Sequence, residues 1–191
     1  VNYQLTTLNI LRDTILEAGY DSVALYLTKI YVLPLAKQLN DTELITSLEA
    51  VLRITLGVKA PNFRIENPSN PSNQTLYDLD GATTYLLIFW SSDCGHCLNE
   101  LPELHDYISK RPQKNISVIA IGIENNNLQW SKTIAPWSKF IHSIAEGKWE
   151  HAITKSYSIE ATPTYFVLDA SKVIRAKPYS LRDLIAVLNQ K

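Results

Sequence analysis

The segment WSSDCGHCLNELP, residues 90–102, contains both cysteines of the chain, Cys94 and Cys97. It follows TTYLLIFW, residues 83–90, a nearly continuous β-prone run of the kind found in strands buried on both faces. Cys94 is therefore expected in a short turn, where a buried strand ends and a helix begins. That helix is indicated by apolar side chains at helical spacing, at Leu98, Leu101, Leu104 and Ile108.

The chain beyond this helix predicts a mixed sheet. ISVIAIGI, residues 116–123, is a second buried strand, so strand, helix and strand form a βαβ unit with a parallel pair. The stretches TPTYFVLD and KVIRAKP indicate an antiparallel hairpin that turns at Ala170 and Ser171. SLRDLIAVLNQ, capped by Ser180, predicts a final amphipathic helix. Two less regular helices are expected between these elements, over residues 128–140 and 149–157.

The first 57 residues predict helices that carry no cluster of acids, histidines or cysteines. Gly19 ends the first helix, and Pro34 kinks or restarts the second because proline lacks an N–H and clashes with the preceding turn. Asp41 caps a third helix, which Gly57 closes. These helices are expected to pack on a neighbour or a partner.

The composition changes after Gly57, where the chain becomes rich in proline, asparagine and serine. Residues 63–65 and 75–79 predict two short strands around a surface loop. We therefore expect a helical N-terminal segment, residues 1–57, followed by one α/β domain, residues 58–191, with helices on both faces of a mixed central sheet.

The overall composition excludes several classes of protein. The chain has 191 residues, 46% hydrophobic and 19% charged, with a formal net charge of −1. Nucleic acid and anionic membrane surfaces are therefore not expected as partners. No apolar run approaches the ~18 residues that span a bilayer. The chain starts at Val1 and contains no methionine, so we expect that an upstream piece has been removed, such as a leader, a lipid anchor or a domain.

The cysteine pair itself favours redox chemistry over a metal site or a structural bridge. Structural zinc needs four ligands, and this chain offers one CxxC motif and four scattered histidines. A disulfide across so short a loop constrains the unfolded chain little and so stabilises little. We expect neither a metal nor any cofactor beyond the dithiol.

The position of each sulfur suggests its role. Cys94 precedes a helix, whose free N–H groups and dipole favour a thiolate, and a protonated His96 would act in the same direction. Gly95 leaves room for an incoming disulfide. Cys97 lies one turn into the helix, where it can attack a mixed disulfide and release the product.

The order of motifs resembles the thioredoxin-like superfamily. GVKAPNFRI, YLLIFW, the CxxC motif, ELP and ATPT before a strand are most similar to extracytoplasmic thiol-disulfide oxidoreductases of the TlpA/ResA type, over about residues 59–191. The resemblance implies protein thiols and disulfides as substrates and a redox partner protein. It also implies an extracytoplasmic, periplasm-facing location, with a membrane anchor outside this chain as an option.

The resemblance also implies roles for individual residues. Cys94 matches the nucleophile, Cys97 the resolving thiol and Glu100 the acid that such proteins keep beside the cysteines. Thr162 and Pro163 match the pair that is joined by a cis peptide bond and aligns a substrate strand. Trp90 is expected to shape the redox surface, and with Gly95, His96, Thr162 and Pro163 it forms the expected substrate-binding set.

The chain departs from the family pattern at two positions. Ordinary thioredoxin has a buried aspartate where this chain has Ile88, and family members often have an aromatic residue where this chain has Asp93. A carboxylate at that position disfavours a thiolate on the next residue. Ser91, three residues before Cys94, resembles the motif of peroxiredoxins, although Leu87 replaces their proline. A peroxidase and a non-catalytic thioredoxin-like interaction module therefore remain as alternatives.

Overall fold

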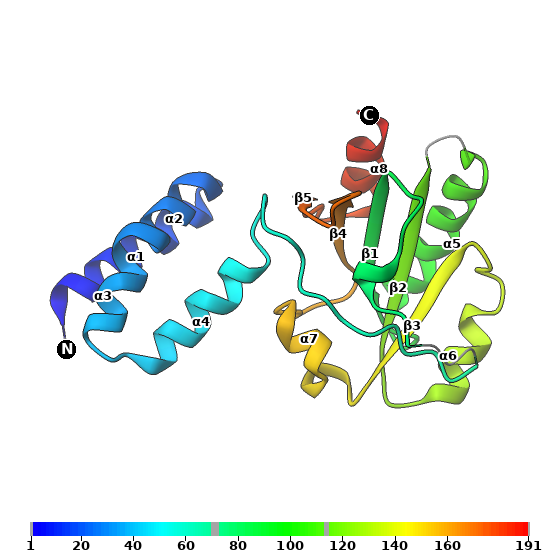
Figure 1. Cartoon of the computed structure of the whole chain (residues 1–191), viewed down its shortest axis with the longest axis horizontal. Helices are drawn as coiled ribbons and strands as arrows, with labels where there is room; N and C mark the ends of the chain where they lie inside the picture. The colour runs from blue at the N-terminus through cyan, green and yellow to red at the C-terminus, as the bar shows by residue number, and fades with distance from the viewer. Residues whose placement is uncertain (1, 70–72, 113–114, 191) are drawn as a thin grey trace. The chain divides into compact units, whose positions relative to one another are not determined.

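The computed structural model describes residues 2–69, 73–112 and 115–190. The chain divides into two compact units, Val1–Leu52 and Arg53–Lys191 (Figure 1). The boundary expected from the sequence, between residues 57 and 58, lies a few residues further along and stays a prediction. No helix in the described ranges has both the length and the apolar character needed to cross a bilayer.

The N-terminal unit is helical, as expected. Its small core is formed by buried Leu5, Val32, Ala36 and Leu48. The elements are α1 (Tyr3–Glu17), α2 (Asp21–Leu27), a π-helical turn η1 (Thr28–Val32), α3 (Leu33–Gln38) and α4 (Thr42–Arg53).

Proline and aspartate act in this unit as the sequence indicates. Pro34 lies in the first turn of α3, directly after the π-helical turn, so the helix restarts there. Asp41 accepts the N–H of Leu44 at 3.1 Å and so caps α4. The expected end of this helix at Gly57 is wrong, because α4 stops at Arg53 and the Gly57 N–H donates to the carbonyl of Ile174 at 2.8 Å.

The second unit is built on a five-stranded mixed sheet with strand order β3-β2-β1-β4-β5. β1 pairs in parallel with β2, and β2 in parallel with β3, whereas the β1–β4 and β4–β5 pairs are antiparallel. The expected βαβ unit and C-terminal hairpin are therefore confirmed. The strands are β1 (Thr84–Trp90), β2 (Ile116–Glu124), β3 (Phe140–Glu146), β4 (Thr164–Asp169) and β5 (Ile174–Ala176).

Helices cover both faces of this sheet, which is why every residue of β1 is buried (Figure 1). On one face, Leu86, Ile88 and Trp90 of β1 pack in a core with α5 (Gly95–Ser109), α6 (Asn127–Ile134) and α8 (Leu181–Asn189). On the other face, Leu87 and Phe89 pack with α7 (Ala152–Ser156) and the segment before β1. The alternation follows from the two-residue period of a strand.

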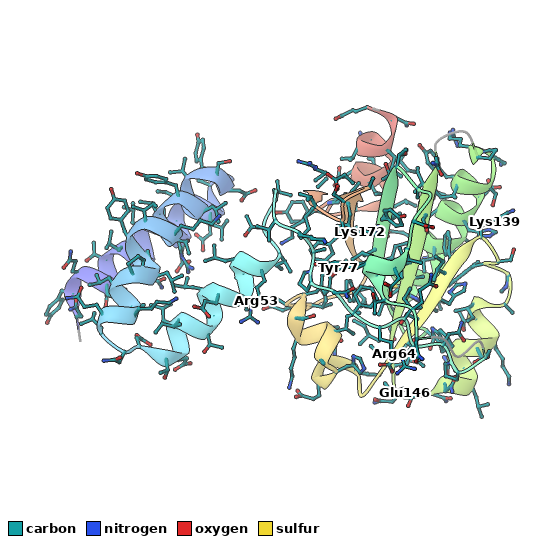
Figure 2. All side chains as sticks on the ribbon, viewed as in Figure 1. Arg53, Arg64, Tyr77, Lys139, Glu146 and Lys172 are labelled. Carbon is teal, nitrogen blue, oxygen red and sulfur yellow. A yellow bond between two sulfur atoms is a disulfide. The ribbon has the colours of Figure 1, made fainter. Side chains whose placement is uncertain are left out.

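The segment before β1 is fastened by polar contacts rather than by the two expected strands. Only one antiparallel bridge, Arg64 with Thr75, joins the two stretches within the described part, and residues Leu76–Asp78 form the 3-10 turn η2. Tyr77 donates to the Ala60 carbonyl at 2.6 Å. Lys172, nearly buried, donates to the Leu79 carbonyl at 2.8 Å (Figure 2).

The helix expected over residues 128–140 ends at Ile134, and the strand β3 follows in a stretch for which the sequence predicted no element. The sequence FIHSIAE has histidine and serine among its apolar residues, so its pattern indicates a strand only weakly. The exposed edge of β2 decides the outcome, because pairing from Val118 to Glu124 satisfies the backbone of both strands.

The close approach of α6 to β2 generates a stability prediction. A Cβ on Gly122 would overlap the buried indole of Trp130. We expect Gly122→Ala to lower the free energy of unfolding by about 1–3 kcal/mol, as overpacked cores do. Urea denaturation measures it. Gly95→Ala is the control, because a Cβ there meets no described atom within 4 Å, and equal losses in both variants would contradict the packing explanation.

Candidate active site

The turn between β1 and α5 holds Cys94 at the N-terminus of α5. The Cys94 N–H donates to the Ser91 carbonyl at 3.1 Å, which closes the turn. Cys94 is the N-cap residue, and its sulfur accepts the N–H of Cys97 at 3.2 Å. The sulfur therefore occupies the place of a capping oxygen, where free N–H groups and the helix dipole favour negative charge.

The two cysteines form a disulfide and differ sharply in exposure. Their Cα atoms lie 5.3 Å apart. Cys97 is completely buried in the core beneath α5, whereas Cys94 is half-buried. Gly95 and His96, between them, are exposed. An incoming thiol or disulfide can therefore approach Cys94 but not Cys97.

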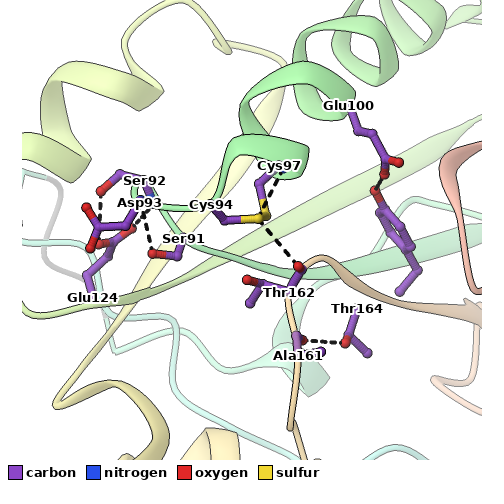
Figure 3. Close-up of a disulfide and its surroundings, with 11 residues drawn as sticks. Ser91, Ser92, Asp93, Cys94, Cys97, Glu100, Glu124, Ala161, Thr162 and Thr164 are labelled. Atoms are coloured by element: carbon purple, nitrogen blue, oxygen red, sulfur yellow. Dashed lines mark hydrogen bonds between the residues drawn. A yellow bond between two sulfur atoms is a disulfide. The ribbon is translucent and has the colours of Figure 1, made fainter.

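The peptide bond between Thr162 and Pro163 is cis, as expected from the sequence. The Thr162 carbonyl oxygen lies 3.4 Å from the Cys94 sulfur (Figure 3). When Cys94 is reduced, its thiol can donate to this carbonyl. The loop before β4 and the CxxC turn are thus brought together although 68 residues separate them.

Glu100 lies one turn beyond Cys97 on α5 and faces β4. Its carboxylate accepts the hydroxyl of Tyr165 at 2.5 Å (Figure 3). Burial raises the pKa of Tyr165, and the bond to Glu100 adds to that shift. Tyr165 therefore remains a neutral donor that fixes the orientation of the carboxylate. The resemblance to TlpA/ResA-type proteins pointed to Glu100, three residues after Cys97, but nothing in the sequence pointed to Tyr165.

A second acid, Glu124, accepts hydrogen bonds from the turn before Cys94 and was not predicted from the sequence. It ends β2, is buried, and accepts the N–H of Ser92 at 2.5 Å and the Ser92 hydroxyl at 3.0 Å. Burial raises the pKa of Glu124, and the two bonds from Ser92 act in the opposite direction. The available signal was an acid at the carboxyl end of an otherwise apolar run, beside the expected turn.

Trp90 takes a different place from the one expected. It is completely buried, and its ring packs edge-on against Trp137 with centroids 5.1 Å apart. Trp90 is thus part of the core under the CxxC turn and is not among the residues that the protein presents to a partner. Among the described residues, no group of three or more histidine, cysteine, aspartate and glutamate side chains could hold a metal ion.

Residues 55–180 match the Redoxin family, which is about two thirds of the chain. The chain belongs to the Redoxin family. The thioredoxin-like assignment made from the CxxC and ATPT motifs is therefore confirmed.

Curated relatives of this Redoxin chain are named as thiol-disulfide enzymes. A thiol:disulfide interchange protein DsbE of Xylella fastidiosa (strain 9a5c) is 34% identical over 125 residues, which cover 63% of this chain and 59% of the relative. A thiol-disulfide oxidoreductase ResA of Bacillus cereus (strain ZK / E33L) is 26% identical over 118 residues, 61% of this chain and 65% of the relative. The chain thus spans less than two thirds of either protein.

Solved structures agree with the fold. A domain of a possible thiol-disulfide isomerase from Cytophaga hutchinsonii is 36% identical, with a TM-score of 0.61 over 71% of this chain and 92% of that one. A thioredoxin-like protein from Bacteroides caccae has a TM-score of 0.69 over 97% of this chain and 77% of that one, at 21% identity. Both likenesses support the mixed α/β architecture expected from the sequence.

The raised pKa of Glu124 generates a pH prediction. The folded protein keeps the Glu124 proton above the ordinary carboxyl pKa of 4.5, where the unfolded chain has lost it. This contribution to the free energy of unfolding is therefore present below pH 4.5 and is lost as the pH rises through the folded pKa. Glu124→Gln lacks the contribution, so its stability relative to wild type should increase with pH across that window, as measured by urea denaturation.

The matched control for this prediction is Glu146→Gln. Glu146 is the register partner of Glu124 on β3, but it is exposed. A trend of the same size and sign in both variants would mean that general charge, and not the buried position of Glu124, causes the pH dependence.

Proposed function

We propose that this chain is a thiol-disulfide oxidoreductase that exchanges disulfides with protein substrates through Cys94 and Cys97. The observation that carries the proposal is the difference in exposure between the two cysteines. Cys94 is half-buried at the N-terminus of α5, and Cys97, one turn later, is fully buried. An accessible, readily ionised thiol beside a sheltered one is the arrangement that sequential exchange requires.

The proposed reaction has two displacement steps. The Cys94 thiolate attacks one sulfur of a substrate disulfide, which forms a mixed disulfide and releases the other substrate sulfur as a thiolate. Cys97 then loses its proton and attacks the Cys94 sulfur, which releases the second substrate thiolate and closes the Cys94–Cys97 disulfide. The substrate is reduced by two electrons and the chain is oxidised by two. The reverse sequence oxidises a substrate dithiol.

Glu100, His96 and Gly95 support these steps in the proposal. Glu100 assists the removal of the proton from Cys97, while Tyr165 holds the carboxylate in one orientation through its 2.5 Å bond. His96 adds positive charge beside the Cys94 thiolate when protonated. The exposed Gly95 leaves the approach to the sulfur open, and the Thr162–Pro163 backbone offers hydrogen-bonding groups to an extended substrate segment.

The wider setting is part of the same proposal. The resemblance to TlpA/ResA-type proteins supports an extracytoplasmic location, a redox partner protein, and an anchor, where one exists, outside this chain. A chain with only two cysteines, both in one motif, has no other thiol to mispair in an oxidising compartment. The helical segment of residues 1–57 is assigned no part in the chemistry.

The assignment of the two thiols can be tested by trapping. Cys97→Ala should accumulate covalent complexes with protein substrates, because the mixed disulfide on Cys94 has no second thiol to resolve it. Cys94→Ala should trap few or none, since Cys97 is buried. Non-reducing electrophoresis with mass spectrometry measures both. Equal trapping by the two variants would reverse or remove the assignment.

The two alternatives give distinct results in the same assay series. A non-catalytic interaction module would trap nothing in either variant and would not turn over a model protein disulfide. A peroxidase would consume hydrogen peroxide with a thiol reductant faster than it exchanges disulfides. Either result would contradict the proposed function.

The role of Glu100 gives a second test. Glu100→Gln should slow release of the mixed disulfide, by about 10²-fold if proton removal limits that step, while formation of the mixed disulfide stays close to wild type. Rapid-quench measurement of both steps separates them. Glu103→Gln, an exposed acid on the same helix, is the control. Equal rates in both variants would make Glu100 a structural partner of Tyr165 only.

A further inference from the structure

Asp93 directly precedes Cys94 and carries the charge that a thiolate at Cys94 should avoid. Its carboxylate is held by two side chains from later parts of the chain. The Lys148 ammonium lies 3.0 Å from Oδ2, and the Gln129 amide donates to Oδ1 at 3.4 Å. Lys148 comes from the 3-10 turn η4 (Lys148–Glu150), and Gln129 from α6.

The backbone around Lys148 is fixed to the same edge of the sheet as the CxxC turn. The Gly147 N–H donates to the Glu124 carbonyl at 3.1 Å, and the buried Thr154 hydroxyl donates to the Lys148 carbonyl at 3.0 Å. Gly147 and Lys148 both have positive φ, 92° and 51°. Two hydrogen bonds and an uncommon backbone conformation therefore bring the lysine to this position.

We propose that Lys148 is a positioning residue for the redox site, which pairs with the Asp93 carboxylate and thereby increases the fraction of Cys94 that is present as thiolate. The inference rests on the proposed function and names a residue that tunes it. Without Lys148, the Asp93 carboxylate would keep only the neutral Gln129 amide as a described partner, next to a sulfur that must become negative.

The charged groups around the turn show why Lys148 matters. Asp93 and Glu124 oppose a thiolate at Cys94, whereas His96, when protonated, and the N-terminus of α5 favour it. Glu100 is engaged with Tyr165 further along the helix. Lys148 is the cation that pairs with Asp93, and its charge also acts on Glu124.

The expected effect is modest because the pair is partly in water. The Asp93 side chain is 61% exposed and that of Lys148 is 29% exposed, so solvent screens their charges. We therefore expect loss of the Lys148 charge to lower the population of Cys94 thiolate by about twofold. A less stable thiolate makes the reduced state less stable, so loss of Lys148 should also make the pair a weaker oxidant.

The experiment measures alkylation of Cys94 by iodoacetamide in the reduced protein, at a series of pH values and at low salt, with mass spectrometry to assign the site. Lys148→Gln should slow alkylation about twofold below the thiol pKa, and Asp93→Asn should accelerate it by a similar factor. The double variant should return close to the wild-type rate. Lys148→Arg should keep the wild-type alkylation rate, because it keeps the positive charge. High salt should reduce the differences in rate between the variants and the wild type.

Lys155→Gln is the matched control, because it removes the same charge from an exposed pair with Glu150, at 2.6 Å, on the neighbouring helix α7. Equal rates in Lys148→Gln and Lys155→Gln would overturn the inference. So would a change in the same direction for Lys148→Gln and Asp93→Asn, since that would indicate a displaced turn and not a charge effect.

This measurement is independent of the proposed function. Alkylation reports the Cys94 thiolate whether or not the protein exchanges disulfides. Failure of the wild type to exchange, with the expected order of alkylation rates, would contradict the function and leave the inference standing. Equilibration of each variant with glutathione provides the second readout, and Lys148→Gln should give the lower reduction potential.

Discussion

The strand β1 lies between a parallel and an antiparallel neighbour, and this arrangement brings Cys94, Glu124 and the Thr162–Pro163 bond to one edge of the sheet. Because β2 runs parallel to β1, its carboxyl end, with Glu124, lies at the same edge as the end of β1. Because β4 runs antiparallel, its amino end, preceded by the cis Thr162–Pro163 bond, reaches that edge as well. The N-terminus of α5 then delivers the sulfur of Cys94 to the place where the three strand ends meet.

The two glutamates near the cysteines, Glu100 and Glu124, have different surroundings and therefore different roles. Glu100 accepts a hydroxyl from Tyr165 at the helix surface, one turn from the sheltered thiol. Glu124 is buried and accepts both polar groups of Ser92, so it holds the turn that carries the accessible thiol. In the proposed mechanism Glu100 moves a proton, whereas Glu124 fixes the backbone of the turn.

Local sequence patterns predicted most of the fold and the redox role of the cysteine pair. They did not predict the contacts between residues that are far apart in the sequence. β1, β2, α5 and the C-terminal hairpin have strong periodicity or uniform burial, which a single segment reveals. β3 does not, because its strand conformation depends on the open edge of β2. Tyr165 directly follows the ATPT motif and Lys148 lies in a segment without a motif, but neither position indicates its partner, so only the folded chain brings them to Glu100 and Asp93. Glu100 could be named from the sequence because the resemblance to TlpA/ResA-type proteins implies an acid there, three residues after Cys97.

The burial of Trp90 beneath the CxxC turn gives the protein a built-in optical signal. Trp90 shares one core with Cys97 and stacks edge-on with Trp137. Opening the Cys94–Cys97 disulfide changes the surroundings of an indole in the same core. The intrinsic fluorescence of the unmodified chain therefore offers a readout of the redox state without a label.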